Sequence, residues 1–424
     1  MGSYRPRIID TELDALMTDL PAIALEGPKG VGKTATAERR ARTTYRLDLP
    51  AARELLEAAP EQLHAAPGPV LLDEWQRWPR CWDLVRRAVD DGAPPGRFLL
   101  TGSAAPVETP VHSGAGRIVS LRMRPLSLAE RALTRPTVSL ATLVSGARPD
   151  VEGRSDVGLA DYLDAVVTSG FPGFSGATPR AVRAQIDGYI ERVVHRDLEE
   201  HGVRVRRQDA MRGWLIAYAA ATSTTASYTA LLDAATPGDA EKPARSTVEG
   251  FRSALQALWL LDPVPGWTPT LNPLKRVAQA PKHHLADPAL AASLLGVAVD
   301  ALLRGRDAGP PALRDGDLAG RLFESLVALS LRTYAQAAEA RVAHFRTRNG
   351  DREVDMIVAR PDGRVVAIEV KIAPSVGDDD VRHLRWLGER YGDDLLDAVV
   401  VTAGRDAYRR RDGIAVIPAA LLGP

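Results

Sequence analysis

The sequence contains very little cysteine and no long hydrophobic run. Cys81 is the only cysteine in 424 residues, which excludes a disulfide within the chain and suits a reducing compartment. No stretch approaches the ~18 consecutive apolar residues that a membrane span needs, and residues 1–11 are polar, without the apolar core of a signal peptide. We therefore expect a cytoplasmic protein, whose length suggests about three domains.

The chain also lacks an excess of charge of either sign, and few of its basic residues are lysine. Lysine plus arginine and aspartate plus glutamate both number 54. No overall field therefore draws the protein to nucleic acid, and any DNA-binding face must be a local patch. Only six residues are lysine. In such a chain, lysine is retained where a compact ammonium is needed and a planar guanidinium does not serve, and we interpret Lys33 and Lys371 in this way.

A glycine-rich stretch near the N-terminus predicts a phosphate-binding loop. Residues 22–25 before it are typical of a short buried strand, and residues 35–42 after it are typical of a helix. The loop amides and the helix N-terminus would surround a phosphate, Lys33 would neutralise the β- and γ-phosphates, and Thr34 would bind Mg²⁺. The stretch fits G-x-x-x-x-G-K-[ST] at every fixed position: Gly27, Pro28, Lys29, Gly30, Val31, Gly32, Lys33 and Thr34. It predicts ATP or ADP with Mg²⁺ as the cofactors.

Three later features complete the expected nucleotide site. An apolar strand over 69–74 ends in Asp73, near the magnesium, and Glu74, which would polarise the attacking water. The alternative is a strand that ends in exposed acids. Thr101 and Ser103, at the end of the next strand, could sense the γ-phosphate. Arg117 precedes a strand over 118–123 and is either a surface arginine or a residue that reaches the nucleotide of a neighbouring subunit, which would require a homo-oligomer.

Alternating short strands and helices predict a parallel α/β sheet with the site at the carboxyl ends of its strands. The order of the motifs resembles that of an AAA-type ATPase, specifically the prokaryotic ATP-binding proteins with a DUF4143 C-terminal region. The resemblance rests on residues 27–34, 71–76, 100–103, 116–117, 124–127, 162–172, 196–198, 281–288 and 323–324. It implies an ATPase domain (1–135), a helical lid (150–210), a winged helix (211–300) and a nuclease-like α/β domain (315–424).

The middle of the chain carries weaker signals. Residues 134–158 are rich in Pro, Gly, Ser and Asp and predict an exposed loop or domain boundary. The winged-helix region has three expected helices and two expected wing strands, and its basic residues could contact DNA phosphates. The alternative is a protein-docking module with a solvated basic face. The basic residues are Arg245, Arg252, Lys275, Arg276 and Lys282.

The C-terminal region predicts a second site. Glu324 lies on an expected helix, Asp355 on a strand over 353–359, and Glu369 and Lys371 on one face of a strand over 365–372. The set resembles the PD-(D/E)XK nuclease pattern. Asp355 and Glu369 would bind Mg²⁺ or Mn²⁺ with help from Glu324, and Lys371 would activate a water molecule. The alternative is a structural ion pair or a binding surface.

These features predict an ATP-hydrolysing enzyme that couples its nucleotide state to DNA binding or processing and carries a metal-dependent nuclease-like site. The alternative is an ATP-driven switch whose middle and C-terminal domains bind a DNA or protein partner without cleavage.

Overall fold

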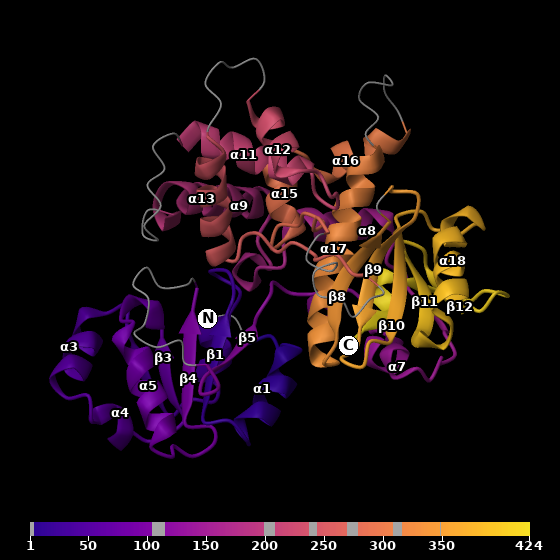
Figure 1. The fold of residues 1–424 in the computed structure, drawn as a ribbon. Coiled ribbons are helices and arrows are strands. Elements are labelled where there is room, and N and C mark those ends of the chain that lie inside the picture. The colour runs from indigo at the N-terminus through magenta and orange to yellow at the C-terminus, as the bar shows by residue number, and fades with distance from the viewer. Residues whose placement is uncertain are drawn as a thin grey trace.

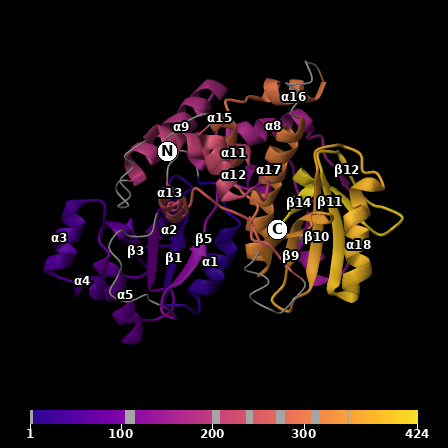
Figure 2. The same ribbon diagram turned by 45° about the horizontal axis from the view of Figure 1, so that its top comes forward.

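The computed structural model describes residues 4–103, 115–198, 208–236, 244–268, 279–307, 316–347 and 349–424. An N-terminal α/β part and a C-terminal α/β part lie on opposite sides of the molecule, and a helical middle part lies across both (Figures 1 and 2). The long helix α17 (Gly316–Ala337) runs near the centre and contacts both the N-terminal helix α1 (Ile9–Met17) and the middle part. In the part of the chain that is described, no helix has the length and apolar character needed to cross a bilayer.

The N-terminal part is a five-stranded parallel sheet, as the sequence predicted. Its strand order is β2 (Thr43–Arg46), β3 (Val70–Asp73), β4 (Phe98–Gly102), β1 (Ala22–Glu26) and β5 (Val119–Arg122). Side chains alternate between the faces: Ile23 and Leu25 join one core, Ala22 and Ala24 the other. The helices between the strands are α2 (Lys33–Glu38), α3 (Pro50–Ala58), α4 (Gln62–Ala65) and α5 (Arg80–Asp90). Because every strand runs the same way, the loops after β1, β3 and β4 meet at one edge.

The middle part is helical. It contains α8 (Leu159–Thr168), α9 (Pro179–Arg192) with a π-helical turn (Val193–Asp197), α11 (Gln208–Ala220), α12 (Tyr228–Ala235), α13 (Arg245–Ala257), α15 (Pro288–Leu294) and α16 (Val299–Asp307). The two expected wing strands contact each other through antiparallel bridges between Leu261 and Leu285 and between Val264 and Lys282. The winged-helix fold itself stays a prediction.

The C-terminal part is built on a seven-stranded mixed sheet. Its order is β7 (Gly153–Arg154), β12 (Asp406–Arg409), β13 (Ala415–Pro418), β11 (Leu395–Thr402), β10 (Val365–Lys371), β9 (Glu353–Ala359) and β8 (Arg341–Arg346). Helix α17 packs on one face of the sheet, and α18 (Arg382–Tyr391) packs on the other. On β10, Ile368 and Val370 point toward α17, so Glu369 and Lys371 share the opposite face.

Residues 134–158, expected to form an exposed loop or a domain boundary, are not an exposed loop, because this segment is built into the C-terminal part. Strand β6 (Val138–Ser139) pairs with β14 (Leu422–Gly423), β7 pairs with β12, and α7 (Leu140–Ser145) packs on α17 and β11. Leu140, Leu143 and Val144 are buried there. Two-residue strands carry no usable periodicity, and a helix of six residues is too short to stand out from a Pro- and Gly-rich background. A helix of four residues, α6 (Leu128–Arg131), precedes this segment.

Candidate functional site: a phosphate loop and an acidic cluster

The predicted phosphate loop joins β1 to α2 at the carboxyl edge of the parallel sheet. Two of its glycines are required by geometry: Gly32 has φ 97° at the start of α2, and a Cβ on Gly27 would lie 2.1 Å from the Met123 carbonyl oxygen. The Lys33 ammonium donates hydrogen bonds to the carbonyl oxygens of Gly27 (2.8 Å) and Pro28 (2.9 Å). Burial lowers the pKa of Lys33 to about 8, although Glu74 and Asp73 act in the opposite direction. The ammonium is thus already inside the loop that would receive the phosphates.

Strands β3 and β4 bring the predicted magnesium and γ-phosphate residues together. The Asp73 carboxylate accepts hydrogen bonds from the hydroxyl of Thr34, at 2.7 Å, and from the hydroxyl of Thr101. A carboxylate and a hydroxyl are hard oxygen ligands of the kind that Mg²⁺ prefers, so these residues fit the ion that the sequence predicted. Glu74 follows directly in a left-handed conformation, with φ 57°. Its carboxylate lies 3.3 Å from the Ser103 hydroxyl, which donates to it.

The left-handed conformation of Glu74 is uncommon for a residue with a Cβ, and such strained conformations cluster at active sites. We expect Glu74→Gln to retain ATP binding and to lower the rate of hydrolysis by about 10²-fold or more, because an amide has the same shape but is a poor proton acceptor. Phosphate release and ATP affinity, measured on the same preparation, check this. Lost binding with normal turnover of the bound fraction would mean that Glu74 is structural.

Arg117 lies away from the phosphate loop of its own chain. It precedes β5, and β5 runs parallel to β1 with Val119 opposite Ile23, so Arg117 lies at the edge of the sheet opposite to the loop. Its guanidinium is half-exposed and pairs with Asp90 at 2.9 Å. The contact of Arg117 with a nucleotide bound to a second copy of the chain stays a prediction, and so does the homo-oligomer that this contact would require.

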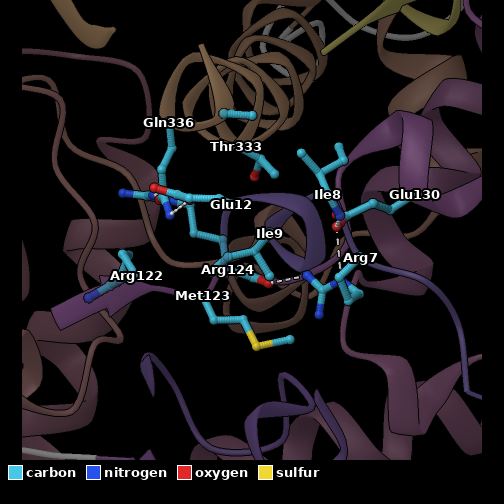
Figure 3. Close-up of a pocket in the computed structure, with 11 residues that line it drawn as sticks. Arg7, Ile8, Ile9, Glu12, Arg122, Met123, Arg124, Glu130, Thr333 and Gln336 are labelled. Carbon is cyan, nitrogen blue, oxygen red and sulfur yellow. Dashed lines mark hydrogen bonds and ion pairs between the residues drawn. The ribbon is translucent and has the colours of Figure 1, made fainter. Parts of the chain in front are cut away.

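Arg7, which the sequence did not single out, supports the phosphate loop from behind. Its guanidinium donates to the carbonyl oxygens of Val31 and Arg124, both at 2.7 Å, and to the Glu130 carboxylate at 2.9 Å. Figure 3 shows Arg7 between Arg124 and Glu130, in a narrow pocket between α1, β5 and α17. The free space there is about 10 Å³, which admits at most a water molecule. The pocket is therefore a packing feature that fixes the loop, and it is not a ligand site.

Motifs that lie far apart in the sequence meet beside this loop. The Leu126 amide donates to the Gly170 carbonyl oxygen at 2.7 Å, and the Gly170 amide donates to the Asp287 carboxylate at 2.7 Å. A Cβ on Gly170 would lie 2.7 Å from the Leu126 carbonyl oxygen, so only glycine allows this approach. A Cβ on Gly30 would lie in ordinary contact with the Phe171 ring, at 3.7 Å. The Lys29 ammonium of the loop also lies 3.9 Å from the Asp197 carboxylate, so the middle part lies directly beside the phosphate loop.

Asp262 connects all three parts of the chain. Its carboxylate lies 2.9 Å from Arg124 after β5, 3.7 Å from Arg122 at the end of β5, and 2.9 Å from Arg332 on α17. The Arg122 guanidinium also stacks on Trp259, 3.8 Å from the ring centroid. Burial would raise the pKa of Asp262, but the guanidiniums of Arg124, Arg332 and Arg122 outweigh it and hold that pKa well below its ordinary value.

At the C-terminal site the four predicted residues lie close together, but an unexpected lysine lies among them. The Lys282 ammonium lies 2.9 Å from Asp355, 3.0 Å from Glu324 and 3.1 Å from Glu353. Asp355 also accepts a hydrogen bond from the Val370 amide, next to Glu369, at 2.9 Å. We call Glu324, Glu353, Asp355 and Glu369 the acidic cluster.

The charges in the acidic cluster follow from this geometry. Burial would lower the pKa of Lys282, but Asp355, Glu324 and Glu353 outweigh it and raise that pKa, so the ammonium is charged. Burial raises the pKa of Glu324 to about 8 against the attraction of Lys282. Burial, with Asp355 as a neighbour, also raises the pKa of Glu369.

A metal ion does not fit the acidic cluster in this arrangement. Lys371 lies 3.6 Å from Glu369, so the cluster holds a second ammonium as well. Across the described ranges, no group of three or more His, Cys, Asp or Glu side chains is arranged to hold a metal ion. Metal binding by Asp355 and Glu369 with Lys371 as the catalytic lysine, as predicted, has no support from this geometry.

Known protein families match both the N-terminal and the C-terminal region of the chain, as the resemblance found in the sequence implied. A family model described as an AAA domain matches residues 19–132, and a domain of unknown function, DUF4143, matches residues 319–422. The chain therefore contains an AAA domain and a DUF4143 domain. Another domain of unknown function, DUF8612, matches residues 159–301, between the two. The AAA domain supports ATP binding and hydrolysis.

Two curated proteins are similar to this chain over nearly its whole length. The uncharacterized proteins Rv2008c of Mycobacterium tuberculosis and Mb2031c of Mycobacterium bovis are each 26% identical over 409 residues, which cover 94% of this chain and 80% of theirs. The Walker-type ATPase PABY2304 of Pyrococcus abyssi is 16% identical, with a TM-score of 0.40, and the match covers 69% of this chain and 99% of that chain. This last likeness is too distant to add to the argument.

The expected phosphate-contacting set of the middle part needs a correction. Lys282 is only 1% exposed and is held by carboxylates, so it cannot contact DNA phosphates. Arg252 stacks on Tyr228 at 4.6 Å. Lys275 and Arg276 lie outside the described residues, as does the side chain of Arg245. The adjacent histidines, His283 and His284, are both buried.

The sequence reasoning missed the roles of three charged residues, and only one of them carried a signal. Lys282 is one of six lysines in the chain, which is the property that singled out Lys33. Arg7 and Asp262 are common residue types in segments without a motif, and their partners are distant in sequence.

Proposed function

We propose that this DUF4143 protein is an ATP-driven switch, in which the nucleotide state of the phosphate loop controls how the middle and C-terminal parts bind a partner. The observation that carries the proposal is the position of the end of β5. It lies between the phosphate loop and Asp262, which contacts all three parts of the chain.

The chemistry at the loop follows from its residues. Lys33 would bind the β- and γ-phosphates, and Thr34 with Asp73 would hold Mg²⁺, which would supply charge neutralisation. Glu74 accepts a proton from the attacking water and orients it. Thr101 and Ser103, on the neighbouring strand, are placed to respond to loss of the γ-phosphate.

A continuous set of contacts leads from this chemistry to the other parts. The Met123 amide donates to the Glu26 carbonyl oxygen at 2.7 Å, immediately before the loop. Arg122 and Arg124 flank Met123 and both contact Asp262. A displacement of the loop on hydrolysis would therefore move Arg122 and Arg124, which are paired with Asp262 in the middle part.

The partner that we propose is DNA, bound without cleavage. The expected winged helix supports DNA as the class of partner, although Lys282 drops out of its expected basic set, and the lysine inside the acidic cluster speaks against metal-dependent cutting. Binding of a labelled duplex to the full chain, measured by fluorescence anisotropy with ATP and with ADP, tests this part. A release of metal-dependent cleavage products from any single- or double-stranded substrate would favour the nuclease instead.

Amide hydrogen exchange tests the switch itself. With Glu74→Gln holding ATP, we expect residues 259–267 and 332–337 to change protection relative to the ADP-bound state. Lys33→Ala, which should not bind nucleotide, is the control and should show no change. Changes confined to the phosphate loop and its neighbouring strands would contradict the proposal while leaving ATP hydrolysis intact.

A further inference from the structure

We infer that Lys282 is the built-in cation of the acidic cluster, and that this cluster joins the middle part of the chain to the C-terminal sheet in place of binding a metal. The inference goes beyond the proposed function and does not depend on it. It concerns a different site, and its test needs no nucleotide.

The Lys282 ammonium has as many hydrogen-bond donors as it has carboxylate neighbours. An ammonium has three N–H donors, and the Lys282 nitrogen lies within 3.1 Å of three different carboxylates, those of Glu324, Glu353 and Asp355. The side chain is 1% exposed, so water does not compete for these donors. A divalent cation among the same oxygens would lie against a positive charge at contact distance, where repulsion in a buried site is strong. The ammonium and a metal ion are therefore mutually exclusive.

The main chain holds the Lys282 side chain in the acidic cluster. Its backbone amide and carbonyl are both bonded to Val264 at 2.9 Å. The stretch after Val264 is in turn bonded to the edge strand β8, where the Trp267 amide donates to the His344 carbonyl oxygen at 2.6 Å and the His344 amide donates to the Pro265 carbonyl oxygen at 2.9 Å. Removing the ammonium from the cluster would require these main-chain bonds to break or the long side chain to turn within a packed interior.

Lys282 and the four acids of the cluster come from different regions of the chain. Lys282 belongs to the region that matches one family model, and the four acids belong to the region that matches another. The ion pairs thus hold two separately recognised regions together. Removing one partner of a buried charge set leaves the others unpaired and is strongly destabilising.

Manganese titration of the full chain, without nucleotide, tests the inference. Calorimetry should detect the same Mn²⁺ binding, if any, in the wild type and in Asp355→Asn, because the acidic cluster of the wild type binds no metal. In Lys282→Ala the carboxylates lose their cation, and we expect an Mn²⁺ site at least ~10-fold tighter than any site of the wild type. That site should disappear in the double variant Lys282→Ala with Asp355→Asn. Asp355-dependent Mn²⁺ binding by the wild type would overturn the inference.

Lys371 provides a matched control within the same cluster. It contacts Glu369 at 3.6 Å, and its side chain is 35% exposed. Lys282→Met should lower the melting temperature clearly more than Lys371→Met, and equal losses would contradict the joining role. If Lys282→Ala does not fold, the comparison of wild type with Asp355→Asn still decides whether the cluster binds a metal.

Discussion

Lys33→Ala should abolish ATP turnover, with a loss in kcat/KM on the order of 10²-fold or more. The Lys33 ammonium is buried in the loop and is held by the carbonyl oxygens of Gly27 and Pro28. A bound triphosphate would offer it a full negative charge in place of two neutral carbonyl groups. Alanine removes this cation and leaves the phosphate charge without its nearest partner. Phosphate release and the binding of a fluorescent ATP analogue measure the two effects separately.

Lys29→Ala is the matched control for this prediction. Lys29 lies in the same loop, but half of its side chain is exposed and its ion pair with Asp197 is long, at 3.9 Å. We expect a much smaller loss for Lys29→Ala than for Lys33→Ala. Unchanged ATP affinity and hydrolysis in Lys33→Ala would contradict the assignment of the phosphate loop.

Asp262→Asn should destabilise the protein by about 3–5 kcal/mol, the usual cost of leaving a buried charge without its partner. Three guanidiniums, those of Arg122, Arg124 and Arg332, surround the carboxylate. Burial lowers the pKa of Arg122 to about 9 and that of Arg332 to about 10, and without Asp262 these charges repel one another. Urea unfolding followed by tryptophan fluorescence measures the loss.

Asp406→Asn is the control for Asp262→Asn. Asp406 also pairs with an arginine, Arg154 at 3.1 Å, but both side chains are mostly exposed, so the loss should stay below about 1 kcal/mol. Because the pKa of Asp262 is depressed in the folded protein, its contribution to the free energy of unfolding should be fully present above about pH 4, the ordinary aspartate pKa. That contribution should be lost only as the pH falls through the pKa of Asp262 in the folded protein. Equal losses in the two variants would mean that Asp262 is not the buried link between the three parts.

The N-terminal site was predictable because its chemistry is local in sequence. A phosphate loop needs its glycines, lysine and threonine at fixed spacing, since one strand, one turn and one helix must be consecutive. The strand that ends in Asp73 and Glu74 and the strand that ends in Thr101 were recognisable by their apolar runs. The parallel sheet then brings their ends together, and Asp73 accepts from both Thr34 and Thr101.

The contacts between the parts were not predictable in this way. Lys282 lies 42 residues from Glu324 and 73 residues from Asp355 along the chain. As part of a basic set, it looked like a contact for phosphate. Segment 134–158 looked like a loop because its strands are two residues long and their partners lie at the far end of the chain.

The sequence by itself therefore determined the nucleotide site and the order of the parts, because short-range spacing specifies a phosphate loop and apolar periodicity specifies the strands that bring the acids to it. Only the tertiary structure decided which charges meet. An arginine or lysine has the same appearance in sequence whether it faces water, a phosphate or a buried carboxylate, and its partner is set by how distant segments pack. For this reason the sequence placed Glu324, Asp355, Glu369 and Lys371 at one site, and the fold alone placed Lys282 among their carboxylates.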